Sequence, residues 1–468
     1  MTKYQQGFPV NENGEIVLSG TNQAVVGTLP IDMLPVDDNG GLKLGNVATL
    51  VTDAGGGPSL QAGGSEYSFH ALQRVRNLGT KVFAGQAYSD TGLNRTYLTG
   101  IALEQHFDAV RIGFYNANTA TAATLKCAVA VGPDASNKTG AGLTWINGTF
   151  AGAATVTPAA ASDAANPPLT WTDWIAINSV PRTDGGKFPL LYVESFVASG
   201  GGNTTVHGTA GSIATITNDP AGRIGWTFSV TGDSVGATVS SPARDVTNFG
   251  VIQYLARGKV ITVAAFGDSI TAGSSAVRAY QSWAYKACAQ LSDNYGMSIQ
   301  YANCGWAGQT TAQILTRLTY NLPLMTPDVV LIPAFSPNDA SPPTAASIAA
   351  QRSNLVQAVN LCRQYGAIPI IWTGIPKSAT ATTAAWTQVA DDLRKALNAS
   401  VLNEYGTAMI TMDLASVMGD GSSPERIRSA ALGYPADLST DWLHPNDAGY
   451  EAMAAVAAPQ IAKICRMF

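Results

Sequence analysis

Residues 259–271 read KVITVAAFGDSIT. The run from Val260 to Phe266 is apolar and rich in β-branched residues, a pattern typical of a buried parallel strand. It stops at Gly267-Asp268-Ser269, and a helix-like stretch of small residues follows. Open α/β sheets place their ligand sites at such strand ends, where helix N-terminal amides can stabilise an oxyanion. Ser269 is therefore the best nucleophile candidate in the chain.

The chain from about residue 255 onward alternates strand-like and helix-like segments. Such alternation predicts βαβ units built around a mainly parallel sheet. We expect strands at 259–266, 297–302, 328–335, 368–375 and 408–414, with helices at 276–295, in the stretch that ends at 325, and at 344–365, 383–405 and 446–464. The predicted fold of residues 255–468 is therefore an α/β domain.

The preceding sequence has a different character. Residues 66–254 contain runs of strand length, such as 109–115, 125–131 and 190–197, separated by turns of Gly, Asn, Asp and Pro. Short strands divided by turns predict a β-sandwich or jelly-roll-like accessory domain. Residues 1–65 are rich in Gly, Asn and Asp and hold too little apolar material for a core of their own. We expect them to form an extended segment that serves docking or oligomerisation.

The composition narrows the classes of function. The 468 residues carry a formal net charge of −5, which gives no basic footprint for nucleic acid. No apolar run reaches the length of a membrane span, and the first residues lack the apolar core of a signal peptide. We therefore expect a protein that stays in the cell or leaves by a route without Sec export, such as lysis. The five cysteines are odd in number and form no CxxC pair, so we expect buried thiols rather than a disulfide framework or a zinc cluster.

A serine nucleophile needs a general base, which a third group usually orients. The chain has four histidines, and His444 is the only one in the predicted α/β domain. It closely follows Asp441, just before the last expected helix, and a short turn there can place the carboxylate against the imidazole. Ser269, His444 and Asp441 are the candidate catalytic residues. The remaining histidines, which we interpret as structural, are His70, His106 and His207.

Two further strand ends offer donors for an oxyanion hole. After the second expected strand comes 303–308, Asn-Cys-Gly-Trp-Ala-Gly, in which a glycine lets the backbone approach a substrate closely. After the third comes 336–339, Ser-Pro-Asn-Asp, where Asn338 can donate a second hydrogen bond. Neighbouring strand ends of one sheet thus offer Ser, Gly, Asn and an Asp–His pair.

Four sequence blocks together resemble the GDSL, or SGNH, hydrolase family. They are GDSITAG at 267–273, NCGWAG at 303–308, SPND at 336–339 and DWLHP at 441–445. The resemblance covers about residues 258–468, and the blocks occur in the order of the family. It implies a three-layer flavodoxin-like fold and ester hydrolysis, with no metal and no cofactor.

The resemblance also implies a role for each matched residue. Ser269 takes the place of the nucleophile, and Asp441 and His444 take the places of its triad partners. The amides of Ser269 and Gly308 and the side chain of Asn338 take the places of the oxyanion hole. The third block of the family usually opens with glycine, as GxND, whereas serine and proline precede Asn338 here. We expect this departure to tilt the loop or to narrow the pocket.

A second GDS triplet lies at 232–236, Gly-Asp-Ser-Val-Gly. It also fits G-x-S-x-G, the nucleophile elbow of α/β-hydrolases, which must follow a strand and open a helix. Strand-like residues lie on both sides of it, so the pattern indicates a strand–turn–strand unit. We therefore predict that Ser234 is not a nucleophile.

The substrate is inferred from the loops around the expected site. Long acyl chains need bulky apolar linings, whereas these loops offer Trp306, Gln309 and Trp442 among small polar residues. That choice suits a sugar that carries a small acyl group, most of all O-acetyl. The tryptophans of the β-rich part serve either core packing or sugar stacking; they are Trp145, Trp171, Trp174 and Trp226.

The N-terminal stretch at 4–17 is similar to short leaders of phage tail and other virion proteins. A tail-associated deacetylase of host surface glycan would unite this leader with the low charge and the β-rich front half. The expected partners are then an acylated carbohydrate, a virion protein bound through the N-terminal segment, and further copies of the chain. Two other interpretations stay open, a glycan-binding adhesin with an inactive hydrolase domain and a lipid esterase or thioesterase.

Overall fold

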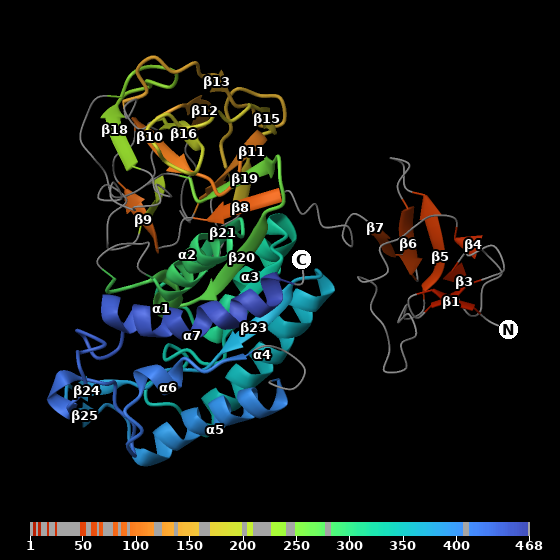
Figure 1. Ribbon diagram of the computed structural model, residues 1–468. Coiled ribbons are helices and arrows are strands. Elements are labelled where there is room, and N and C mark those ends of the chain that lie inside the picture. The colour runs from red at the N-terminus through yellow and green to blue at the C-terminus, as the bar shows by residue number, and fades with distance from the viewer. Residues whose placement is uncertain are drawn as a thin grey trace. The chain divides into compact units, whose positions relative to one another are not determined.

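The computed structural model of the chain (Figure 1) divides into two compact units, Met1–Val75 and Arg76–Phe468. The structure describes residues 94–116, 124–134, 139–158, 169–198, 204–208, 226–239, 249–276, 282–405 and 411–466, together with short strands before residue 94. His70 lies outside the described residues, as do the side chains of His207 and Trp226.

The first unit contains two small antiparallel sheets. One has the order β1-β2-β3-β4 and the other the order β5-β6-β7. The strands are β1 (Lys3–Gln5), β2 (Phe8–Val10), β3 (Ile16–Val17), β4 (Ala24–Val25), β5 (Val47–Thr52), β6 (Pro58–Ala62) and β7 (Ser65–Ser68). Pairing inside the unit differs from the extended segment that we expected, since backbone hydrogen bonds between short strands need no apolar run. Docking and oligomerisation through this unit stay predictions.

A parallel sheet forms the centre of the C-terminal part, as its sequence predicts. The strand order is β21-β20-β22-β23-β26. The strands are β20 (Ile261–Gly267), β21 (Ile299–Gly305), β22 (Val329–Pro333), β23 (Ile368–Trp372) and β26 (Thr411–Met412). Every residue of β20, β21 and β22 is buried, which explains the largely apolar character of β20 and β22.

Helices cover both faces of this sheet (Figure 1). One core cluster joins the strands to α2 (Trp283–Tyr295) and α7 (Asp447–Cys465), and includes Trp283 and Tyr450. A second cluster joins the opposite face to α3 (Thr311–Met325), α4 (Ala345–Gln364) and α5 (Gln388–Glu404). The result is a three-layer α/β arrangement.

Two helices begin later than our expected bounds. The α5 helix begins at Gln388 and not at 383, because Thr387 caps it by accepting from the Ala390 amide. The hairpin of β24 (Ser378–Thr380) and β25 (Thr383–Ala384) occupies the residues before it. The α2 helix begins at Trp283 rather than 276. Only Thr411–Met412 of the strand expected at 408–414 is a strand, and 406–410 lie outside the described residues.

The β-rich part contains two antiparallel layers that share a core. One layer has the order β13-β12-β16-β10-β18, and the other contains β14, β11 and β19. The strands are β10 (Arg95–Ala102), β11 (Phe107–Tyr115), β12 (Leu125–Gly132), β13 (Ile146–Asn147), β14 (Leu169–Trp171), β15 (Ile175–Ala176), β16 (Leu190–Val197), β18 (Trp226–Thr231) and β19 (Val251–Ala256), with β9 (Gln86–Asp90) and β17 (Thr204–Gly208) as a separate pair. Side chains such as Val129 and Ile252 meet in one cluster. The jelly-roll topology stays a prediction.

The sheet of the C-terminal part continues into the β-rich part. Strand β8 (Leu78–Val82) lies parallel to β21, with Val82 opposite Ala302, and antiparallel to β19. Buried hydrogen bonds cross the junction, since the Thr80 amide donates to Thr262 Oγ1 at 3.1 Å and Tyr254 Oη donates to Gln300 at 3.0 Å. One sheet therefore passes across the domain boundary that we predicted at 254/255.

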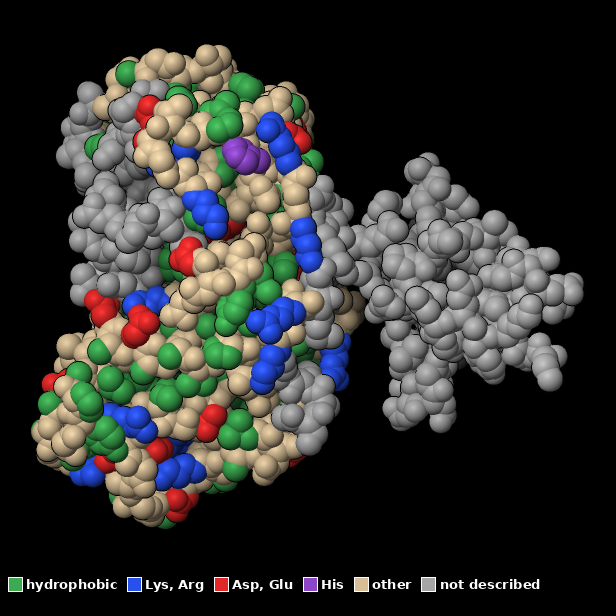
Figure 2. Space-filling model, viewed as in Figure 1, with side chains coloured by type: hydrophobic (Ala, Val, Ile, Leu, Met, Phe, Trp, Pro, Cys, Tyr) green, Lys and Arg blue, Asp and Glu red, His purple; other side chains and the backbone are tan. Residues whose placement is uncertain are grey.

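The five cysteines are all buried and none of them forms a disulfide. Among the described helices, none combines the length and the apolar character that a bilayer span requires. Acidic and basic side chains are interspersed with uncharged ones on the described face of the second unit (Figure 2).

Candidate active site

Ser269 lies at the carboxyl end of β20, where the strand turns directly into α1 (Ser269–Ala272). Asp268 is fully buried and caps this turn, with Oδ1 accepting from the Ile270 amide at 3.0 Å. The turn is tight, because a Cβ atom on Gly267 would lie 1.9 Å from Thr271 Oγ1. The serine hydroxyl is thus held at the sheet edge, at the first residue of a helical turn.

The structure brings Ser269, His444 and Asp441 together from the two ends of the domain. His444 Nε2 lies 2.9 Å from Ser269 Oγ, and His444 Nδ1 lies 2.6 Å from Asp441 Oδ2. When Nδ1 carries its proton toward the carboxylate, Nε2 is left as an acceptor for the serine hydroxyl. This is the geometry of a hydroxyl activated by a neighbouring base.

The Asp441 carboxylate is stabilised in its charged form. Partial burial on its own would raise its pKa, but hydrogen bonds from the His444 ring and from the His444 and Leu443 amides outweigh this and lower the pKa to about 2. The two amides donate to Oδ1 at 2.7 and 3.0 Å. A carboxylate fixed in this way orients the imidazole and stabilises it when it becomes protonated.

Ser439 also holds the histidine loop, and the sequence analysis did not identify it. Its hydroxyl donates to the His444 carbonyl at 2.6 Å, and the Asn446 amide donates to the Leu438 carbonyl at 3.0 Å. Asn446 then caps α7 by accepting from the Gly449 amide. A serine beside DWLHP was the only sequence signal for this contact, and such a signal is weak.

Gly308 lies in the loop between β21 and α3. Its φ of +80° is in the left-handed region that favours glycine, and a Cβ atom there would meet no neighbour within 4 Å. Asn303 fixes the start of this loop, because its side chain donates to the Ala272 carbonyl at 3.2 Å and accepts from the Gly305 amide at 3.1 Å. The loop that carries Gly308 is thereby tied to the helix that carries Ser269.

Asn338 follows β22, and its side-chain amide donates to the Gln309 carbonyl at 3.0 Å. The serine of the third block, Ser336, makes a structural hydrogen bond. Ser336 is fully buried, and its hydroxyl lies 2.7 Å from Asp268 Oδ2, so it links the Asn338 loop to the GDS turn. Burial raises the pKa of Asp268, while the hydrogen bonds from Ser336 and Ile270 counteract that rise.

The three residues that we predicted to contact substrate lie apart from the described pocket. Trp306 is buried with the Arg317 guanidinium 4.3 Å from its ring centre, and Gln309 is also buried. Trp442 is half-buried with a φ of +64°. Substrate contact at these positions stays a prediction.

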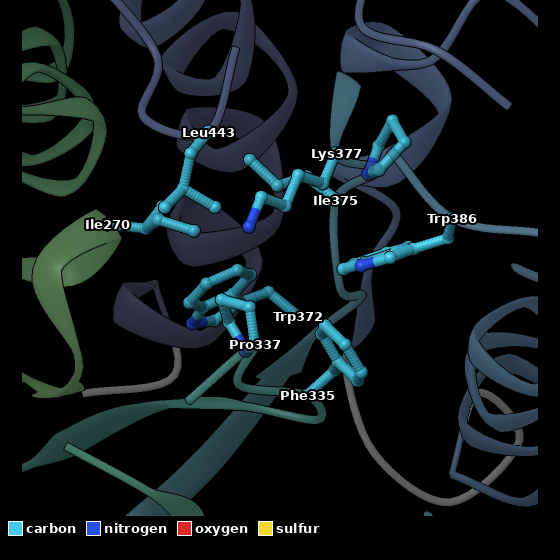
Figure 3. Close-up of a pocket in the computed structure, with 9 residues that line it drawn as sticks. Ile270, Phe335, Pro337, Trp372, Ile375, Lys377, Trp386 and Leu443 are labelled. Carbon is cyan, nitrogen blue, oxygen red and sulfur yellow. The ribbon is translucent and has the colours of Figure 1, made fainter. Parts of the chain in front are cut away.

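A pocket opens beside the candidate nucleophile (Figure 3). Its lining residues are Ile270, Phe335, Pro337, Trp372, Ile375, Pro376, Lys377, Trp386 and Leu443. The sequence pattern did not assign 372–377 to the site, although this segment includes the end of the strand expected at 368–375 and so lies at the same edge of the sheet. Pro337 forms part of the wall, and a tilted loop or a narrower pocket at the departure from the glycine pattern stays a prediction.

The other candidates lie elsewhere. Ser234 is in a turn of the β-rich part, where its amide donates to Thr96 Oγ1 at 2.9 Å. His106 Nδ1 lies 2.9 Å from Ser179 Oγ, a structural contact between chain segments. Among the tryptophans, Trp145 and Trp171 pack against core clusters, whereas Trp174 is 40% exposed with Arg111 over its ring.

The C-terminal part is thus a three-layer α/β domain with a hydrogen-bonded serine, histidine and aspartate at the carboxyl edge of its sheet. Residues 265–452 match the model of the GDSL-like lipase/acylhydrolase family, and this domain belongs to that family.

Several solved structures are similar to less than half of this chain. A GDSL-like lipase from Bacteroides thetaiotaomicron is 20% identical over 43% of this chain and 88% of its own, with a TM-score of 0.33. A lipase/acylhydrolase from Enterococcus faecalis is 22% identical over 43% and 96%, with a TM-score of 0.33. A family 3 carbohydrate esterase from Clostridium thermocellum is 18% identical over 45% and 98%, with a TM-score of 0.33. A search of curated proteins gave no match.

Proposed function

We propose that the protein is a serine esterase that removes small acyl groups, most of all O-acetyl groups, from a carbohydrate. The observation that carries the proposal is the hydrogen-bonded chain from Ser269 through His444 to Asp441 at the carboxyl edge of the sheet. A family of acylhydrolases supplies the reaction class.

In the proposed mechanism His444 takes the proton of Ser269 as the hydroxyl attacks the ester carbonyl. The Asp441 carboxylate stabilises the imidazolium that forms, and His444 then protonates the leaving alcohol. Water repeats the same path on the acyl-enzyme and releases the acid. The low pKa of Asp441 supports this role, because the carboxylate is charged throughout the pH range of esterase assays.

The oxyanion of the tetrahedral intermediate is assigned to the amides of Ser269 and Gly308 and to the side chain of Asn338. The left-handed backbone of Gly308 and the tie between the Asn338 loop and Asp268 support this assignment. Loss of one such donor reduces kcat by roughly 10²–10³-fold, and Asn338→Ala is the direct test.

The pocket has the bulky apolar walls that we expected of a long-chain acyl site, and only its small volume supports the preference for a small acyl group. Its cavity volume is about 10 Å³, which is roughly the space for one water molecule. Long acyl chains would require the bulky walls to move. Trp306 and Gln309 are buried, so the carbohydrate part of the proposal rests on the accessory β-rich part, a fold-level analogy.

The test is hydrolysis of p-nitrophenyl acetate and p-nitrophenyl octanoate by the wild type, Ser269→Ala and the matched variant Ser234→Ala, followed by acetate release from acetylated polysaccharides. Acetate turnover that only Ser269→Ala abolishes supports the proposal. A preference for octanoate would favour a lipid esterase or thioesterase. A wild type that is inert on every ester would overturn the proposal in favour of a glycan-binding adhesin. The virion location and the oligomeric state stay predictions.

A further inference from the structure

The pocket in Figure 3 belongs to the site of the proposed esterase by its position in the chain. Ile270 directly follows Ser269, Pro337 directly precedes Asn338, and Leu443 directly precedes His444. Three separate loops that carry the proposed nucleophile, oxyanion donor and base therefore each contribute a wall. A group of the substrate close to the scissile ester would occupy this space.

The pocket is apolar apart from one cation. Of its lining residues only Lys377 is charged, and the side chain extends into the pocket between aromatic and aliphatic walls (Figure 3). Its Nζ donates to Ser341 Oγ at 3.3 Å, and Trp386 Nε1 donates to the same oxygen at 3.2 Å. Within the part of the chain that the structure describes, no carboxylate lies within 4 Å of this ammonium group.

The ammonium group of Lys377 is half-buried and hydrogen-bonded to a neutral hydroxyl, so it remains able to bind an anion. Trp372 and Trp386 are buried and line the same pocket as Lys377. An anionic group in the pocket would supply the missing charge and would make a charge-assisted hydrogen bond.

The loop of Lys377 is held rigidly at both ends. Gly374 exchanges hydrogen bonds with the Asn398 side chain at 2.8 and 2.9 Å, and its carbonyl also accepts from Arg394 at 2.9 Å. On the other side, the Ser378 amide donates to the Trp442 carbonyl at 3.0 Å, within the loop of His444. The cation is thus positioned relative to the proposed base, as a specificity group should be.

We propose that Lys377 is a substrate-binding residue that selects esters carrying a carboxylate next to the scissile bond. This inference rests on the proposed esterase function and names its substrate class. The carboxylate has two sources, the acyl group of a dicarboxylic half-ester or the alcohol part, as in a glycan that contains uronic acid.

The experiment compares kcat/KM for two matched pairs of esters. Mono-p-nitrophenyl succinate against p-nitrophenyl butyrate places the charge on the acyl side, and 4-carboxyphenyl acetate against phenyl acetate places it on the alcohol side. The variants are Lys377→Met and Lys377→Arg, with Lys463→Gln as the matched control, since Lys463 lies on α7 and contacts Gln460.

We expect Lys377→Met to lose roughly 10- to 100-fold in kcat/KM, mainly through KM, for the charged ester of one pair. Neutral esters should change less than about twofold, Lys377→Arg should keep much of the preference, and Lys463→Gln should match the wild type. The pair that responds identifies the source of the carboxylate. Equal effects of Lys377→Met on charged and neutral esters would overturn the inference and leave the esterase intact. A wild type inert on all four esters would overturn the proposed function, and the inference with it.

Discussion

Two turns of this chain share the sequence Gly-Asp-Ser and differ in everything that surrounds it. At 267–269 the triplet ends a buried parallel strand and opens a helix, and Ser269 lies 2.9 Å from His444. At 232–234 it ends an antiparallel strand and continues into a turn, where Asp233 pairs with Lys126 at the surface. The comparison shows that the position of the triplet in the fold, and not its sequence, decides whether its serine lies beside a base. Four predictions test the difference.

The largest effect is expected from the two serines. Ser269→Ala removes the nucleophile and should lower kcat on p-nitrophenyl acetate by at least about 10⁴-fold. Ser234→Ala should leave kcat within about twofold, because no base contacts that residue in the described structure. Circular dichroism of both variants checks that the fold is kept. Residual turnover in Ser269→Ala equal to the wild type would assign the activity to another site.

Asp441→Asn is expected to have the next largest effect. The carboxamide no longer fixes the imidazole with its charge, so kcat should fall roughly 10³–10⁴-fold. Asp233→Asn, at the other GDS turn, is the matched control and should be silent. The wild-type pH profile adds a second readout. A carboxyl with a pKa lowered to about 2 stays charged above that pH, so its protonation should reduce activity only as the pH falls toward 2. Wild-type kcat in Asp441→Asn would contradict the role of this carboxylate.

The two aspartates of the triplets should differ in stability. Asp268→Ala removes a helix cap and leaves the Ile270 amide without its acceptor, while the buried Ser336 hydroxyl retains only the Gln309 carbonyl at 3.0 Å. The expected loss is about 2–4 kcal/mol in the free energy of unfolding. Asp233→Ala breaks only a surface ion pair and should cost less than about 0.5 kcal/mol. Urea unfolding measures the free energy of unfolding of both variants. Equal losses would show that the contacts of Asp268 do not stabilise the fold.

The smallest effect concerns the residue that anchors the second turn. Glu194 is buried and accepts from the Gly236 amide, and desolvation raises its pKa from 4.5 to about 8. Between these values the folded state binds more protons than the unfolded state, so stability falls as the pH rises from about 4.5 to 8. Glu194→Gln should remove this loss and gain on the order of 1–3 kcal/mol at pH 8 relative to the wild type. Thermal unfolding at pH 5 and pH 8 tests it, and a variant that keeps the wild-type pH slope would refute it.

Much of the C-terminal fold and its site was predictable from sequence, because local patterns carry the information. The apolar run before Ser269 predicted a buried strand, and His444 stood out as the only histidine of its domain. Sequence patterns did not predict features that depend on contacts between residues far apart in the chain. The bond from Ser336 to Asp268 joins two separate loops, and the walls around Lys377 come from five segments, so no short window of sequence contains either. The start of α5 was missed for the opposite reason, because a short hairpin has almost no sequence signature.

The strand β8 has a further consequence for how this protein could be divided. It covers one side of β21, whose backbone would otherwise present unpaired amide and carbonyl groups to solvent. An uncovered strand of apolar residues is a template for pairing with other chains. A fragment that begins after residue 257 would retain every proposed catalytic residue and yet be prone to aggregate. The β-rich part therefore protects the edge of the hydrolase sheet. If the β-rich part were replaced by another domain, that domain would have to supply a strand in the place of β8.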